Sequence, residues 1–167
     1  MGRWRPPRQA GSRYITPEGH RRLAEELDHL WRRLRPEVTA AITAAAAEGD
    51  RSENAEYIYR KKQLREIDAR IRHLRKRLEG MRVVATAPDD RKKVFFGAWV
   101  TLLDEDGHEH RHRVVGPDEF DHVPGYISMD APLGRTLMGR RTGDDIRVEA
   151  PGGTREYEIV AVEYPTP

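Results

Sequence analysis

Two apolar stripes at helical spacing, separated by a short break, constrain the fold of this chain more than any other feature. The first stripe contains Leu23, Leu27, Leu30, Leu34 and Val38. The second stripe contains Leu64, Ile67, Ile71, Leu74 and Leu78. Side chains spaced by three or four residues lie on one face of an α-helix. Two matched stripes joined by a short turn predict an antiparallel coiled-coil hairpin, whose arms of about 30 residues would each reach roughly 45 Å.

Local signals mark the ends of the two predicted helices. Thr16 is a good N-cap residue, and Pro17 suits the first helical position, where no backbone N–H is needed. Gly49 is expected to end the first helix, and the second is expected over residues 52–79. Pro36 lies inside the first stripe, so we expect it to kink the helix or interrupt one hydrogen bond without ending the helix.

The apolar pattern changes to period 2 after Val83, which predicts a small antiparallel sheet. The expected strands are 99–103, 111–115, 126–129, 146–150 and 156–163. The pair Asp106-Gly107 marks the first hairpin turn, and Pro151-Gly152-Gly153 marks the second. One short helix is expected over 132–138. The predicted fold class is therefore α+β, a coiled-coil hairpin followed by an antiparallel-sheet domain with one short helix.

Charge divides the chain into a basic and an acidic half. We expect a disordered basic arm at 1–13, the hairpin at 14–82 and the sheet domain at 83–167. The arm carries a net charge of +4, and residues 84–167 carry −6. This asymmetry is typical of two surfaces with different partners, although solvated charges can also fall unevenly.

Composition excludes several classes of protein. The chain has no cysteine, which excludes disulfides and thiolate metal sites. No apolar run approaches membrane-spanning length, and the N-terminus has no apolar signal-peptide core. We therefore expect a soluble cytoplasmic protein with no membrane partner.

The break between the stripes carries two carboxylates. It reads Gly49-Asp50-Arg51-Ser52-Glu53-Asn54-Ala55-Glu56-Tyr57. One interpretation is a capping box, in which Asp50 accepts a backbone N–H and Glu53 reaches back. The other is a finger whose two carboxylates point outward and bind one Mg²⁺, weakly alone and usefully beside a second metal ion fixed in a partner. The two interpretations are compatible, because one carboxylate can cap part of the time.

Basic and aromatic side chains follow the break. The basic ones are Arg60, Lys61, Lys62 and Arg65. They could steer the finger toward nucleic-acid phosphates, or they could form an ordinary solvated helix face. Tyr57 and Tyr59 could stack on a base or fill space at the narrow end of the hairpin.

Three histidines alternate on one predicted strand. They are His108, His110 and His112, and period 2 places them on one face of the sheet. A metal site is conceivable there. Since the sequence contains no second cluster of His or Cys, we favour a surface strand.

Longer motifs extend these short signals. They are the tip sequence, Leu30-Trp31 followed by Arg35-Pro36-Glu37-Val38, Lys93-Val94-Phe95-Phe96-Gly97-Ala98-Trp99-Val100, Tyr126-Ile127-Ser128, Ala131-Pro132-Leu133 and Gly143-Asp144. Together, from about Thr16 to Tyr164, they resemble the Gre transcript cleavage factors of bacterial RNA polymerase. Arg51-Ser52 between the tip acids resembles the GreB type within that family.

The resemblance implies a C-terminal domain of FKBP-like fold that docks on a protruding coiled coil of the largest polymerase subunit. It also implies that the hairpin enters the secondary channel of the polymerase. There Asp50 and Glu53 would help to hold a second Mg²⁺ and orient the attacking water, so that the polymerase cleaves backtracked nascent RNA. The factor itself would not be an enzyme, and we expect a monomer.

The same resemblance assigns supporting residues. Arg51, Ser52, Asn54 and Tyr57 would support the tip. Arg60, Lys61, Lys62 and Arg65 would lie near the RNA 3′ end. Asp130, Ala131, Pro132 and Leu133 would bind polymerase. Gly134 stands where members of the family often have Ala, which we expect to loosen the short helix.

Three alternatives remain open at this level. One is a channel-binding regulator without cleavage activity, although such a protein would have substituted tip acids. Another is a general nucleic-acid-binding coiled coil, which predicts steeply salt-dependent binding to free duplex. Regulation of a nucleotide kinase would suit a shorter hairpin.

Overall fold

The computed structural model describes residues 11–49 and 54–166. The chain divides into two compact units. One is Glu18–Met81, and the other combines Met1–Pro17 with Arg82–Pro167. The division differs from the expected one at the base of the hairpin, where Tyr14–Ile15 and Arg82–Val83 belong to the second unit.

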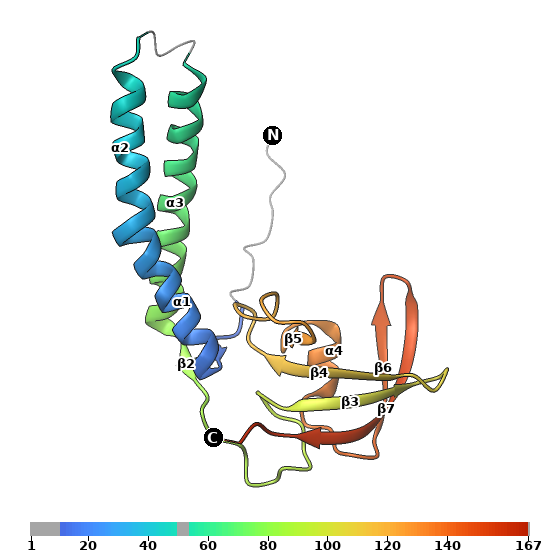
Figure 1. Cartoon of the computed structure of the whole chain (residues 1–167). Helices are drawn as coiled ribbons and strands as arrows, with labels where there is room; N and C mark the ends of the chain where they lie inside the picture. The colour runs from blue at the N-terminus through green and yellow to red at the C-terminus, as the bar shows by residue number, and fades with distance from the viewer. Residues whose placement is uncertain (1–10, 50–53, 167) are drawn as a thin grey trace, which may run out of the picture. The chain divides into compact units, whose positions relative to one another are not determined.

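The first unit is the predicted helical hairpin. Its elements are α1 (Pro17–His29), η1 (Leu30–Leu34), α2 (Arg35–Ala46) and α3 (Ala55–Gly80). The arms α2 and α3 run side by side (Figure 1). None of the helices in the described part of the chain combines the length and the apolar content needed to cross a membrane.

The first arm keeps its helical path through Pro36 by a local change of register. The five residues Leu30–Leu34 directly precede α2 and form a π-helical turn. In this turn the backbone N–H of Arg35 donates to the carbonyl oxygen of Leu30. Proline has no N–H to donate, and its ring crowds the preceding turn. The wider turn accommodates this defect. The prediction that Pro36 interrupts the hydrogen bonding without ending the helix is confirmed.

The two apolar stripes meet as predicted. Val38, Ile67 and Ile71 are buried. The partly buried side chains packed around them are Leu27, Leu30, Leu34, Ile42 and Leu64. Two ion pairs also join the arms, Arg35–Asp68 at 2.8 Å and Arg70–Glu26 at 2.7 Å. These pairs are partly exposed, so the apolar contacts supply most of the cohesion.

The second unit is built on a mixed five-stranded sheet in the order β5-β4-β3-β7-β6. The strands are β3 (Trp99–Asp104), β4 (Glu109–Val115), β5 (Tyr126–Ser128), β6 (Asp145–Ala150) and β7 (Gly153–Glu163). The helix α4 (Pro132–Leu137) packs against β5 and β6. The buried core under it includes Val100, Leu102 and Leu137.

The expectation of a purely antiparallel sheet is wrong at one strand. β5 pairs with β4 in parallel, with Val114 opposite Ile127. Residues 116–125 connect the two strands, and a connection of that length lets the chain cross back before it re-enters the sheet. A second small sheet was not predicted: β1 (Tyr14–Ile15) and β2 (Arg82–Val83) also pair in parallel.

A buried carboxylate fixes the segment that precedes the hairpin. Glu119 is 1% exposed. Its two oxygens accept hydrogen bonds from the Thr16 backbone N–H at 2.8 Å and from the Thr16 hydroxyl at 2.5 Å. Burial raises the pKa of Glu119, and the bonds from Thr16 oppose that rise.

Close backbone packing explains Gly134. A Cβ atom added there would lie 2.1 Å from the carbonyl oxygen of Ser128 and 2.9 Å from the Cα of Met129. Glycine therefore lets α4 approach β5. The expectation that Gly134 loosens the short helix stays a prediction, and the packing function of this glycine was not expected from the sequence.

Gly134→Ala should lower the free energy of unfolding by about 1–3 kcal/mol, because the added methyl overpacks a backbone contact. Gly152→Ala is the matched control, since no atom lies within 4 Å of a Cβ added at Gly152. That control should stay within about 0.5 kcal/mol of wild type. Urea denaturation followed by circular dichroism measures both, and equal stabilities would contradict the packing argument.

Glu119→Gln should change how stability depends on pH. Because the folded state raises the pKa of Glu119, it holds this proton more tightly than the unfolded state does. The resulting stabilisation is full below the ordinary pKa of 4.5 and is lost as the pH rises through the raised pKa.

Glutamine imitates the protonated carboxyl and does not titrate. The free energy of unfolding of wild type, minus that of Glu119→Gln, should therefore fall as the pH rises through this window. Urea denaturation at a series of pH values measures the difference. A difference that rises with pH would show that the hydrogen bonds from Thr16 outweigh burial.

Candidate functional site

The two helix ends that border the hairpin tip are described, and four residues between them are not. Asp50, Arg51, Ser52 and Glu53, which carry the predicted catalytic, metal-binding and supporting functions, lie outside the described residues. On one side α2 ends at Ala46, and Gly49 has a φ of +128°. On the other side α3 begins at Ala55.

Asn54 closes the hairpin. Its side-chain oxygen accepts a hydrogen bond from the backbone N–H of Tyr57 at 3.0 Å, so Asn54 is the N-cap of α3. Its amide nitrogen donates to the carbonyl oxygen of Ala45 at 2.7 Å, near the end of α2. One side chain therefore accepts from the first turn of α3 and donates to a carbonyl oxygen near the end of α2.

This geometry corrects the capping-box interpretation. That interpretation placed the N-cap at Asp50, whereas the helix begins later and Asn54 occupies the N-cap position. The N-cap side chain of α3 is thus that of Asn54. The expectation that Asn54 supports the tip gains a physical basis in its two hydrogen bonds.

Aromatic and apolar side chains are exposed just below the tip. Ile58 is 54% exposed and Tyr59 is 59% exposed. Tyr57 is partly buried, and the Lys61 ammonium lies 6.0 Å from the centre of its ring. Arg60 lies 5.6 Å from the ring of Tyr59. This surface presents flat rings beside positive charge, which suits stacking against a base.

The four basic residues predicted to lie near nucleic acid are not equivalent. Arg60 forms an ion pair with Glu56 at 2.8 Å and donates to Gln63 at 2.9 Å. Lys61, Lys62 and Arg65 are exposed, and none of them forms an ion pair within the described part of the chain. These three cations are available to an incoming phosphate.

The predicted polymerase-binding residues lie on the loop before α4 and on its first turn. Ala131 is the N-cap of α4, and Pro132 is exposed at its first position. Leu133 packs against the core. Asp130 accepts hydrogen bonds from Ser12, at 2.8 Å from the backbone N–H and at 2.5 Å from the hydroxyl. Pro132 and the edge of Ala131 are therefore the accessible part of this group.

Two contacts correct the expectation for the basic arm. The prediction of a disordered arm at 1–13 is wrong for its last residues, because Ser12 binds Asp130 and the carbonyl oxygen of Arg13 accepts the N–H of Arg82 at 2.8 Å. Residues 1–10 lie outside the described range. No sequence signal links Ser12 to Asp130, since 118 positions separate them.

The three alternating histidines do not act as one group. His110 Nε2 lies 2.7 Å from Asp104 Oδ2, and His108 Nδ1 lies 3.7 Å from the same oxygen. His112 instead faces the carbonyl oxygen of Gly125 at 3.2 Å. The hydrogen bond with His110 is the main reason that the pKa of Asp104 is lowered to about 2.

Comparisons with known proteins agree with this architecture. A family model described as "Transcription elongation factor, N-terminal" matches residues 13–83, and one described as "Transcription elongation factor, GreA/GreB, C-term" matches residues 88–164. The chain is 56% identical over 165 residues to a Pseudomonas aeruginosa protein called transcription elongation factor GreB, covering 99% of this chain and 98% of that protein. A Xanthomonas axonopodis pv. citri protein of the same name is 57% identical, with 98% of both chains covered.

Among solved structures, Gfh1, a GreA factor homologue of Thermus thermophilus, is 27% identical with a TM-score of 0.40, covering 90% of this chain and 97% of that one. The assignment rests on the sequence matches, which span both units. This chain belongs to the GreA/GreB family of transcription elongation factors.

Proposed function

We propose that this chain is a GreB-type factor that binds bacterial RNA polymerase and stimulates cleavage of backtracked nascent RNA. The observation that carries the proposal is the closure of the hairpin by Asn54, which caps α3 and ties it to α2. The N-cap position of α3 is therefore held by Asn54 and not by Asp50 or Glu53. Two carboxylates in the segment that joins the two helices suit delivery to another molecule.

The length of the hairpin suits insertion into a channel. α3 contains 26 residues and, at about 1.5 Å per residue, is roughly 39 Å long. A rod of that length can bring its end deep into a channel while the second unit remains at the mouth. We assign the docking contact to Ala131 and Pro132, which are accessible at the start of α4.

The donor set at the tip suits Mg²⁺. Carboxylate oxygens are the ligands that this ion prefers, and one or two suffice when phosphates and water complete the shell. Asp50 and Glu53 would hold the ion, which would supply positive charge at the phosphodiester under attack and lower the pKa of a bound water. The full ligand set and the substrate belong to the polymerase, so the chain acts as a cofactor protein and not as an enzyme by itself.

The exposed cations on α3 have a function in the same proposal. Lys61, Lys62 and Arg65 neutralise phosphates of the RNA 3′ segment that is extruded during backtracking. Ile58 and Tyr59 offer an exposed surface on which its bases can stack. The protein works as a monomer, because a channel admits one hairpin.

Asp50→Asn and Glu53→Gln should each lower transcript cleavage by about 100-fold or more, since each removes a charged ligand while preserving shape. The assay mixes halted, backtracked polymerase complexes with the factor and Mg²⁺ and follows the release of 3′ RNA fragments. Affinity for polymerase should remain within about twofold of wild type. Glu48→Gln is the control, because Glu48 is an exposed acid beside the tip.

The same assay distinguishes the alternatives. Normal cleavage by both variants would contradict the assignment of the tip acids. A wild-type protein that binds polymerase without shortening the RNA would instead be a channel-binding regulator. Tight and steeply salt-dependent binding to free duplex, with no need for polymerase, would indicate a general nucleic-acid-binding coiled coil.

Substitutions at Asn54 should separate its two hydrogen bonds. Asn54→Asp keeps the N-cap acceptor for Tyr57 and loses the donor to Ala45, whereas Asn54→Ala loses both. Each bond contributes about 1 kcal/mol. We expect amide hydrogen exchange at 55–58 to be slowest in wild type, faster in Asn54→Asp and fastest in Asn54→Ala.

Cleavage should fall in the same order, while affinity for polymerase stays unchanged. Faster exchange with full cleavage would show that the ordering of the tip by Asn54 is unimportant for function. Unchanged exchange in both variants would contradict the two hydrogen bonds of Asn54 themselves.

A further inference from the structure

The turn between β3 and β4 holds a carboxylate in a fixed position. Asp104 N donates to the carbonyl oxygen of His108 at 3.0 Å, and Gly107 adopts a φ of +81°, so the chain reverses in a tight loop. Asp104 Oδ1 accepts the backbone N–H groups of Asp106 and His108, both at 2.9 Å. These bonds occupy one oxygen and fix the direction of the other.

The other carboxylate oxygen of Asp104, Oδ2, faces two imidazoles. His110 Nε2 lies 2.7 Å from Asp104 Oδ2, and His108 Nδ1 lies 3.7 Å from it. Asp106 completes the group, because ligand atoms of Asp104, Asp106 and His108 all lie within 4.8 Å of one another. One nitrogen ligand, from His108, and two carboxylates therefore converge in the turn, and His110 reaches the same Asp104 oxygen from β4.

We propose that this turn is a binding site for a first-row transition-metal dication of the Zn²⁺ type, with Asp104, His108 and His110 as ligands and Asp106 as a fourth. The site is separate from the hairpin tip, and the proposal depends neither on cleavage nor on polymerase.

The donor atoms decide the class of ion. Imidazole nitrogen with carboxylate oxygen suits Zn²⁺ and its neighbours, whereas Mg²⁺ and Ca²⁺ require oxygen ligands throughout. Tetrahedral Zn²⁺ with bonds of about 2.0–2.1 Å places its ligand atoms roughly 3.3–3.5 Å apart. Asp106 and His108 are exposed and can turn toward that spacing, whereas the 2.7 Å between His110 Nε2 and Asp104 Oδ2 must widen by about 0.6 Å when both atoms bind the ion.

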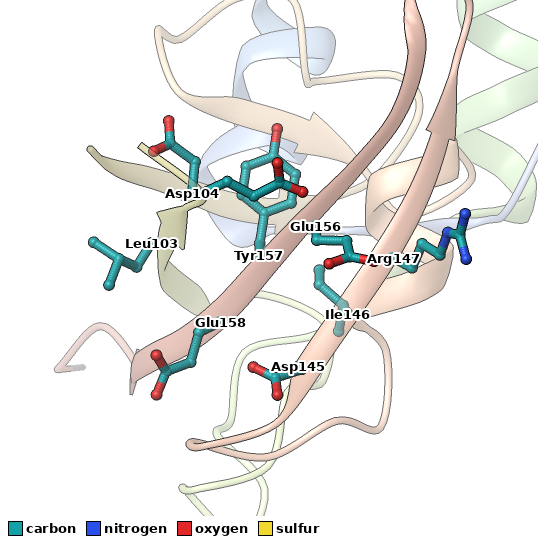
Figure 2. Close-up of a pocket in the computed structure, with 9 residues that line it drawn as sticks. Leu103, Asp104, Asp145, Ile146, Arg147, Glu156, Tyr157 and Glu158 are labelled. Atoms are coloured by element: carbon teal, nitrogen blue, oxygen red, sulfur yellow. The ribbon is translucent and has the colours of Figure 1, made fainter. Parts of the chain in front are cut away.

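The surroundings favour a cation at this turn. A groove of about 400 Å³ is lined by the end of β3 with the following Glu105, by the start of β6 and by the middle of β7 (Figure 2). Its acidic side chains are Asp104, Glu105, Asp145, Glu156 and Glu158, against one basic side chain, Arg147. This excess of negative charge concentrates cations near the turn. A groove that only attracts cations would show no preference for Zn²⁺ over Mg²⁺.

Two contacts hold the ligands from behind. The His110 ring stands edge-on to Tyr157, with centroids 6.0 Å apart, which restricts its rotation. The backbone bonds to Asp104 Oδ1 serve as outer-shell support, of the kind that orients metal ligands in known sites. The competing explanation is a plain Asp104–His110 pair that stabilises the turn and binds no metal.

The test is calorimetric titration of the chelator-treated full-length protein with Zn²⁺ alone, in a buffer that contains excess Mg²⁺. We expect one site with a micromolar Kd. His108→Ala and His110→Ala should each weaken it by about tenfold or more. His112→Ala is the matched control, because His112 lies on the same strand but faces Gly125, and its Kd should match wild type.

A second measurement needs no variant. In ¹H–¹⁵N spectra of the wild-type protein, Zn²⁺ should shift the imidazole nitrogens of His108 and His110 and the amides of 104–110. Binding weaker than millimolar, equal affinity in the two ligand variants and wild type, or shifts confined to other histidines would each overturn the proposal and leave the Asp104–His110 pair as the explanation.

Discussion

The burial of two apolar stripes against each other is the interaction on which the rest of this structure depends. A pair of helices has a narrow core, and here Val38, Ile67 and Ile71 form one buried cluster within it. Such a narrow core gives the end of the hairpin little support, so local contacts must order it. Asn54 meets this need by capping α3 and binding the end of α2 with one side chain. Closure of the hairpin therefore depends on the two hydrogen bonds of Asn54.

The base of the hairpin is fixed by different means. Parallel pairing of β1 with β2 brings together the residues that precede and follow the helices. Glu119 holds Thr16 from a buried position, and Asp130 holds Ser12. Both carboxylates belong to the second unit and act on the chain before α1. Within this unit, hydrogen bonds that span more than a hundred positions therefore hold the segment before α1.

Charge is divided between the two units in a way that fits two kinds of partner. On α3, Lys61, Lys62 and Arg65 have no ion-pair partner among the described residues, which leaves them available to phosphate. At the other end of the chain, acidic side chains gather around the groove beside Asp104. The first arrangement suits RNA and the second suits a metal cation. The uneven charge along the sequence indicated this division without showing which residues are already paired, as Arg60 is with Glu56.

The sequence by itself determined the elements whose signals are local. Helical periodicity placed both arms, because apolar side chains must share a face to be buried, and Asp106-Gly107 marked its hairpin because few residues tolerate that turn. Tertiary structure decided what depends on distant partners. It made β5 parallel to β4, gave Gly134 a packing function against Ser128, and separated His112 from the group around Asp104. Periodicity reports which face a side chain occupies, whereas its contacts depend on how distant segments meet.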